Sequence, residues 1–254
     1  MNDWYDWSKP FNQQEFEEVL KPFMVLDNDK SNKNLNDESI ITYASSAKNM
    51  KGDNMSLQGA KLAGGNPENG RVENDYYATN PEAVRMLLKS YHGFDKMKTI
   101  LEPCVGEGHI TNEINDFYKN EKDITNLDLI DRGYPNTIVA DFLTYDTDKK
   151  YEGIITNPPY SLAKEFAEKG MELLTDNGQM AMFLKIQFLE GQKRKELFEK
   201  YPPKYIYVFR NRMATWNNGL EKDPSTGKRW ATTMCHAWFI WEKGSKSEPI
   251  IRWL

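Results

Sequence analysis

The sequence contains few of the residues that build metal centres and hydrolytic triads. It has only two cysteines, Cys104 and Cys235, and three histidines that are scattered along the chain. Neither set has the spacing of metal ligands or of a nucleophilic triad. We therefore expect no metal site, and we interpret the cysteines as reduced thiols in apolar surroundings, with a cytoplasmic location as the default.

A long apolar run is also absent, as is a basic and apolar leader at the N-terminus. The first absence argues against a transmembrane helix, and the second against a secretion signal. We therefore expect a soluble protein without membrane contact. Its length suffices for one large or two small domains with a substantial core.

Positive charge is scarce overall, since the formal net charge is −5. The charge is nevertheless uneven, because residues 185–254 hold 14 basic and 7 acidic side chains. A basic end suits a phosphate-bearing substrate, although a solvated lysine face produces similar counts.

The chain divides near residue 75 into two parts of different composition. Residues 1–75 are an irregular N-terminal extension, with a predicted helix at 13–20 and a linker-like stretch rich in Gly, Asn and Lys. Residues 76–254 alternate between strand-like and helix-like segments, which predicts an α/β domain with a mostly parallel sheet. Strands are expected at 98–102, 124–130, 137–140, 153–156, 179–186, 205–209 and 237–241, and helices at 81–91, 109–118, 162–174 and 193–200, the first capped by Asn80 and the third by Ser161.

One strand leads into the motif Asn157, Pro158, Pro159 and Tyr160. Prolines have no N–H group, so the backbone carbonyls here point outward without donors beside them. Asn157 adds a side-chain carbonyl oxygen, and Tyr160 adds a flat apolar face. Two acceptors beside a stacking surface suit a planar group with an NH2, whereas the plainer interpretation is a turn that ends a strand.

A second motif, residues 102–108, joins a strand to the next helix. Gly106 and Gly108 allow a ligand to approach the backbone at the helix N-terminus. The third glycine of a dinucleotide fingerprint is missing, which disfavours a nicotinamide cofactor. Glu102 and Glu107 oppose a pyrophosphate and favour a cationic ligand, such as an amine or a sulfonium.

Acidic residues end two later strands at the same expected edge of the sheet. Asp128 is placed to accept hydrogen bonds from ribose hydroxyls, and Asp141 with Phe142 to contact an exocyclic amine and its ring. A loop cap, a turn acid and a core residue are the plainer interpretations. The order of glycines, ribose acid, amine acceptor and Asn-Pro-Pro-Tyr is much harder to explain by chance.

On these motifs, residues 76–242 resemble the S-adenosylmethionine-dependent amino-methyltransferases, in particular adenine-N6 DNA methyltransferases and their small orphan members in phages and prophages. The resemblance implies a Rossmann-like, seven-stranded, mostly parallel sheet of the class I methyltransferase type, S-adenosyl-L-methionine as cofactor, DNA as partner, and a cytoplasmic location in a bacterial or phage-infected host. It implies that Asn157, Pro158, Pro159 and Tyr160 are catalytic. The implied cofactor-binding residues are Tyr77, Thr79, Glu102, Pro103, Gly106, Gly108, Asp128, Leu129, Asp141, Phe142 and Asn157.

Related enzymes that read a DNA sequence usually carry a sizeable recognition domain, often after the catalytic domain, and we expect none between the last predicted strand and Leu254. The basic segment, residues 210–233, is a candidate substitute, with cations and rings suited to phosphate contact and base stacking at Arg210, Arg212, Trp216, Lys228, Arg229 and Trp230. A solvated hairpin is the plainer interpretation. The N-terminal extension or a protein partner are other sources of recognition, and the oligomeric state stays open.

Two other functions fit the same motifs. A protein glutamine or RNA N-methyltransferase would use the same NH2 geometry, since a glutamine amide resembles an exocyclic amine. A catalytically silent phage protein that binds nucleic acid or a partner is the other alternative.

Overall fold

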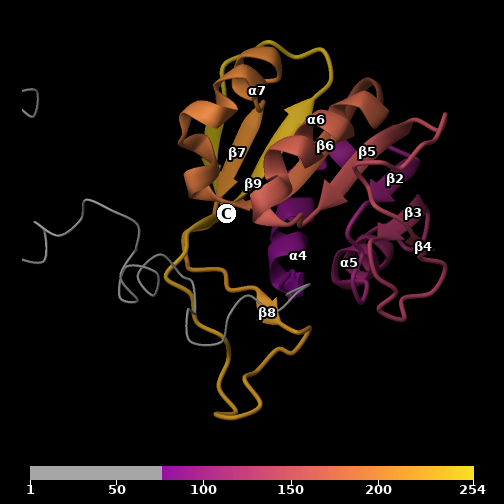
Figure 1. Cartoon of the computed structure of the whole chain (residues 1–254). Helices are drawn as coiled ribbons and strands as arrows, with labels where there is room; N and C mark the ends of the chain where they lie inside the picture. The colour runs from indigo at the N-terminus through magenta and orange to yellow at the C-terminus, as the bar shows by residue number, and fades with distance from the viewer. Residues whose placement is uncertain (1–75) are drawn as a thin grey trace, which may run out of the picture. The chain divides into compact units, whose positions relative to one another are not determined.

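The computed structural model describes residues 76–254, so the helix predicted at residues 13–20 lies outside them. Their centre is an eight-stranded sheet. Across the sheet the strands lie in the order β10 (Ile250–Trp253), β7 (Tyr205–Val208), β9 (His236–Glu242), β6 (Leu174–Lys185), β5 (Tyr151–Thr156), β2 (Thr99–Glu102), β3 (Asp123–Asp128) and β4 (Ile138–Val139) (Figure 1). All neighbours are parallel except β9, which runs antiparallel to both β6 and β7. The predicted α/β fold with a mostly parallel sheet is confirmed.

The number of strands was predicted incorrectly. β10, which pairs with β7 at the edge of the sheet, is the eighth strand and was not expected. All of its side chains are exposed, so no alternation between core and solvent distinguishes it in the sequence.

Helices cover both faces of the sheet. α4 (Pro81–Ser90) and α5 (His109–Phe117) pack on one face, and α6 (Ala163–Leu173) and α7 (Lys195–Lys200) pack on the other. Within β6, Met180 and Met182 face α6 whereas Ala181 and Phe183 face the opposite helices. Both sets are buried, as expected for a sheet that is covered on both sides.

Of the two predicted helix caps, Asn80 is confirmed and Ser161 is wrong. α4 begins after Asn80, whose side chain accepts a hydrogen bond of 3.0 Å from Glu82 N. Ser161, in contrast, does not cap α6 but lies in the 3₁₀ turn η3 (Tyr160–Leu162). Leu162 N donates to Pro159 O at 2.9 Å, so the chain turns tightly after the two prolines before α6 starts.

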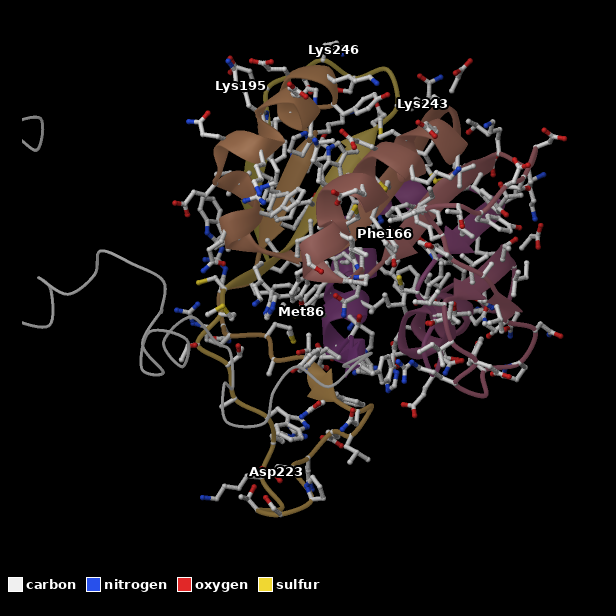
Figure 2. The ribbon with its side chains drawn as sticks, in the orientation of Figure 1. Met86, Phe166, Lys195, Asp223, Lys243 and Lys246 are labelled. Carbon is white, nitrogen blue, oxygen red and sulfur yellow. The ribbon has the colours of Figure 1, made fainter. Side chains whose placement is uncertain are left out.

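The basic segment forms a ribbon outside the main sheet. Its strand β8 (Trp216–Asn217) pairs antiparallel with β1 (Tyr77–Ala78), and Lys222 bridges to Arg229 further along. Figure 2 shows Asp223 at the tip of this segment, away from the sheet. Among residues 76–254, no helix is long and apolar enough to cross a membrane.

Candidate active site

A cavity of about 220 Å³ lies at the carboxyl ends of β2, β3 and β5 and extends to β1. All predicted catalytic residues line it, as do all predicted cofactor-binding residues except Gly106 and Gly108. The cavity is also lined by residues that were not individually predicted as catalytic or cofactor-binding, namely Tyr76, Ala78, Cys104, Val105, His109, Ile110, Ile130, Arg132, Leu162 and Phe166.

Gly106 and Gly108 shape the cavity without lining it. Their φ angles are +55° and +86°, in the left-handed region that glycine adopts most readily. A Cβ on Gly106 would lie 2.3 Å from Tyr76 Oη, and one on Gly108 would lie 1.9 Å from the ring of Tyr134. Both glycines therefore make room for aromatic rings beside the loop between β2 and α5.

Asp128 ends β3 and is held by the glycine loop. Its Oδ2 accepts from Gly106 N at 2.8 Å, and its Oδ1 accepts from Ile130 N at 3.1 Å. Asp128 is therefore a loop cap. A carboxylate has about four acceptor positions, so half remain for a diol in the cavity.

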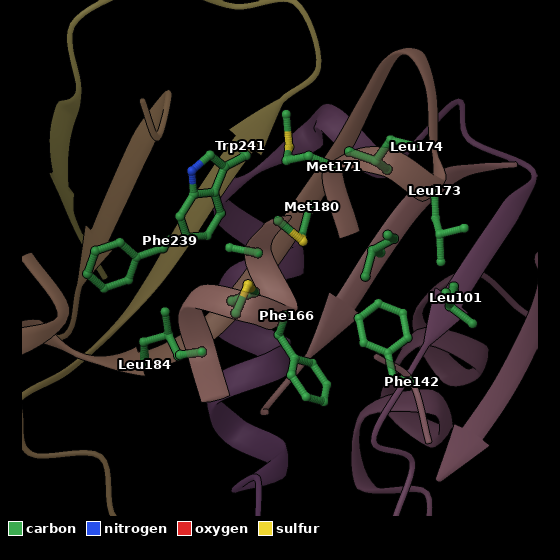
Figure 3. Close-up of a cluster of buried hydrophobic side chains, with 14 of the residues drawn as sticks. Leu101, Phe142, Phe166, Met171, Leu173, Leu174, Met180, Leu184, Phe239 and Trp241 are labelled. Carbon is green, nitrogen blue, oxygen red and sulfur yellow. The ribbon is translucent and has the colours of Figure 1, made fainter. Parts of the chain in front are cut away.

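Asp141 lies in a turn, Phe142 lies in the core, and both line the cavity. Asp141 Oδ1 accepts from Leu143 N at 2.9 Å, and the carboxylate is otherwise exposed. Phe142 is buried against Phe166, with ring centroids 4.8 Å apart (Figure 3). The plainer interpretations as turn acid and core residue are correct, yet both residues also line the cavity.

Glu102 is fully buried, and burial together with the nearby Asp128 raises its pKa well above the usual range. The Thr111 hydroxyl is hydrogen-bonded to Glu102 and lies 2.7 Å from Asn126 Oδ1. The expected attraction of a cation by two carboxylates needs correction, since Glu107 is exposed and does not line the cavity.

The side chain of Asn157 has a defined orientation. Its Nδ2 donates to Tyr77 O at 2.9 Å, within strand β1. Since a backbone carbonyl only accepts hydrogen bonds, Oδ1 must point away from Tyr77. Pro158 and Pro159 follow directly and line the same cavity. The amide therefore presents an acceptor beside prolines that carry no N–H group.

Tyr160 offers a ring rather than a reactive hydroxyl. Its Oη is buried and has no hydrogen-bond partner among the described residues, and burial raises its pKa. The Nζ atom of Lys185 lies 5.1 Å from the ring centroid. The ring of His236 lies 6.0 Å away on another strand, and the pKa of His236 falls to about 4 because of burial.

A group of side chains around Tyr76 lies at the cavity, and its mutual contacts were not predicted from the sequence. Tyr76 Oη accepts from Glu107 N at 3.0 Å and lies 3.2 Å from His109 Nδ1. The guanidinium of Arg132 lies 4.4 Å from the Tyr76 ring centroid, and the ring of Trp216 packs edge-on against His109 at 5.5 Å. These contacts join positions far apart in the chain, so no local motif indicates them.

The predicted nucleic-acid residues lie outside the cavity, and some have structural partners. Trp216 belongs to β8, and the Trp230 indole donates to Leu220 O at 2.6 Å. Arg229 forms an ion pair with Glu221 at 3.1 Å. Arg212 contacts Cys235. The remaining predicted cations are exposed at Arg210 and Lys228.

Comparisons with known proteins identify a shared fold. No family model matches the chain. Over 138 residues it is 30% identical to the Type II methyltransferase M.CvrRI of Paramecium bursaria Chlorella virus XZ-6E, a match that covers 44% of this chain and 36% of that protein. The chain thus spans about a third of the length of this curated relative.

Two solved structures give the fold. A protein of Listeria monocytogenes, described as a class I S-adenosylmethionine-dependent methyltransferase, has a TM-score of 0.51 at 14% identity, over 93% of this chain and 82% of that one. The methyltransferase subunit of a type I restriction-modification system from Streptococcus thermophilus has a TM-score of 0.51 at 18% identity, over 71% and 48%. Residues 76–254 therefore have the class I methyltransferase fold.

Proposed function

We propose that this chain binds S-adenosylmethionine and transfers its methyl group to an exocyclic amino nitrogen, namely adenine N6 in DNA. The orientation of Asn157 carries the proposal, because the bond from Nδ2 to Tyr77 O leaves the amide oxygen as an acceptor on a side chain that lines the cavity together with Asp128 and Asp141. Similarity to a viral Type II methyltransferase supports the reaction class.

The residues of the cavity fit this cofactor. Asp128 retains acceptor positions for the two ribose hydroxyls, and Asp141 with Phe142 offers an acceptor and an apolar wall for the adenine. Tyr77 and Thr79 line the same cavity, and the methionine part would lie against them. The cofactor supplies an electrophilic methyl group on a sulfonium.

The chain's own residues would act mainly by orienting the acceptor. An adenine amino nitrogen is a poor nucleophile because its lone pair is delocalised into the ring. If Asn157 Oδ1 and Pro158 O each accept one of its N–H groups, the nitrogen becomes more tetrahedral and directs its lone pair at the methyl carbon. Alignment of this kind contributes roughly 7–11 kcal/mol in well-oriented systems.

Tyr160 would hold the acceptor base by stacking. A base in a duplex must leave the helix to reach such a site, whereas a single-stranded base needs no unpairing. Stacking on an aromatic ring contributes about 1–3 kcal/mol per base. The buried hydroxyl of Tyr160 is consistent with this use of the ring face.

Expression of the wild type and of Asn157→Ala in the same host tests the proposal. Mass spectrometry of hydrolysed DNA should detect additional N6-methyladenine with the wild type and none with the variant. Calorimetry should show that both proteins still bind the cofactor, which would place the complete loss of methylation in the transfer step. Modified glutamine or modified RNA in place of modified DNA would favour the corresponding alternative acceptor, and unmodified DNA, RNA and protein would refute the proposal.

A further inference from the structure

A second hollow, of about 350 Å³, lies between the start of α6 and the 3₁₀ turn η5 (Gln192–Arg194). Tyr160 is the only residue among the described ones that lines both this hollow and the cofactor cavity. A molecule that occupies the hollow therefore lies beside the ring on which the acceptor base would stack.

The hollow carries a small excess of positive charge. Lys164, Lys193 and Arg194 line it together with Glu165 and Glu196, which leaves one positive charge in excess. Lys164 also lies 3.8 Å from Glu168, whereas Lys193 is exposed and forms no ion pair with any described residue. Such a balance suits one singly charged phosphodiester better than a dense polyanion.

Arg194 is held in place for such a contact. Its guanidinium lies 5.1 Å from the ring centroid of Phe188. Its Nη2 donates to the carbonyls of Gln187 and Glu190, while no described residue accepts from Nη1. The Nη1 group therefore remains as a charged donor for a phosphate oxygen.

We infer that this hollow binds the sugar–phosphate backbone of the acceptor strand next to the nucleotide that is methylated. The inference rests on the proposed function and extends it, since it assigns Lys193 and Arg194 to a phosphate that the basic segment at 210–233 does not contact. Lys185 lies over the same Tyr160 ring from β6, so cations from three elements surround the expected base position.

The experiment measures the KM for unmethylated genomic DNA by incorporation of labelled methyl groups, which requires no knowledge of the target sequence. Lys193→Gln removes an exposed charge that makes no ion pair within residues 76–254, so the variant should fold normally. Lys195→Gln is the matched control, because Lys195 is paired with Glu199 and lies on the outer surface of α7 (Figure 2). Arg194→Lys keeps the positive charge but removes the planar guanidinium, so it tests whether the N–H donors of that group are needed for DNA binding.

Lys193→Gln should raise the KM for DNA roughly three- to tenfold. It should also reduce the slope of log DNA affinity against log salt concentration by about one, the value for one lost phosphate contact. Its cofactor affinity and its kcat should stay at wild-type values, and Lys195→Gln should behave as wild type. Equal KM values for the Lys193 and Lys195 variants would overturn the phosphate site while leaving the proposed function intact. A wild-type protein that labels only protein would overturn both.

Discussion

At the scale of single residues, the ring and the hydroxyl of Tyr160 have different expected roles. Because the hydroxyl is buried without a partner among residues 76–254, Tyr160→Phe should leave the free energy of unfolding unchanged or raise it by up to about 1 kcal/mol. It should also keep most of the methyl-transfer activity. Tyr160→Ala should lose about 1–3 kcal/mol of acceptor binding through lost stacking. Methyl incorporation and denaturant unfolding measure both effects, and a Phe variant as inactive as the Ala variant would assign the hydroxyl a chemical role.

His236 should make the folded state sensitive to acid. Burial lowers its pKa from 6.5 to about 4, and its Nδ1 is hydrogen-bonded to Met213 O at 2.8 Å. Between these values the unfolded chain binds a proton that the folded chain does not, so stability falls as the pH drops. His236→Asn should remove on the order of 2 kcal/mol of the loss between pH 7 and pH 5. Urea unfolding at both pH values measures this, and an unchanged pH dependence would contradict it.

The sequence predicts residues that line the cavity where they belong to one local motif. Asn157 to Tyr160 are four consecutive positions with an interpretable donor and acceptor pattern, and all of them line the cavity. Tyr76, His109 and Arg132 form a group only after folding, so the sequence contains no local pattern for them. Glu107 was misjudged because a sequence does not reveal that this carboxylate points outward.

At the scale of elements, the loop between β2 and α5 depends on the space beside Gly108. Gly133 is a matched control, because its φ of +83° resembles the +86° of Gly108 but a Cβ there meets nothing within 4 Å. Gly133→Ala should cost about 1–2 kcal/mol of stability from backbone strain. Gly108→Ala should cost about 1–3 kcal/mol more, since its Cβ meets the Tyr134 ring. Denaturant unfolding compares the two variants. Equal losses of stability would show that the Tyr134 ring moves aside without any cost in free energy of unfolding.

Most strands and helices follow from local pattern, and the exceptions have physical causes. The buried central strands are apolar runs in the sequence, and Asn80 followed by Pro81 is a typical helix start. β10 and β8 are stabilised by pairing with strands far away in the chain, so their own sequences give little indication of them. The 3₁₀ turn η3 depends on a backbone bond to Pro159 rather than on Ser161.

At the scale of the whole molecule, β1 and β8 connect the basic segment to the Asn-Pro-Pro-Tyr motif. Asn157 is bonded to Tyr77 O in β1, and β1 is paired with Trp216 in β8. Trp216→Ala should therefore weaken cofactor binding several-fold, although Trp216 does not line the cavity, because β8, the pairing partner of β1, loses its packing against His109. Calorimetry with S-adenosylmethionine measures the change. Unaltered cofactor affinity combined with weaker DNA binding would instead limit Trp216 to a contact with nucleic acid.

The most direct test of the central claim uses purified protein and S-adenosylmethionine with an isotopically labelled methyl group. Unmethylated DNA, RNA and protein extract are offered separately, and each is then hydrolysed and analysed by mass spectrometry. The account predicts label in N6-methyladenine from DNA with the wild type and no label with Asn157→Ala. Label confined to N4-methylcytosine, to RNA or to glutamine, or equal labelling by the Asn157 variant, would contradict it.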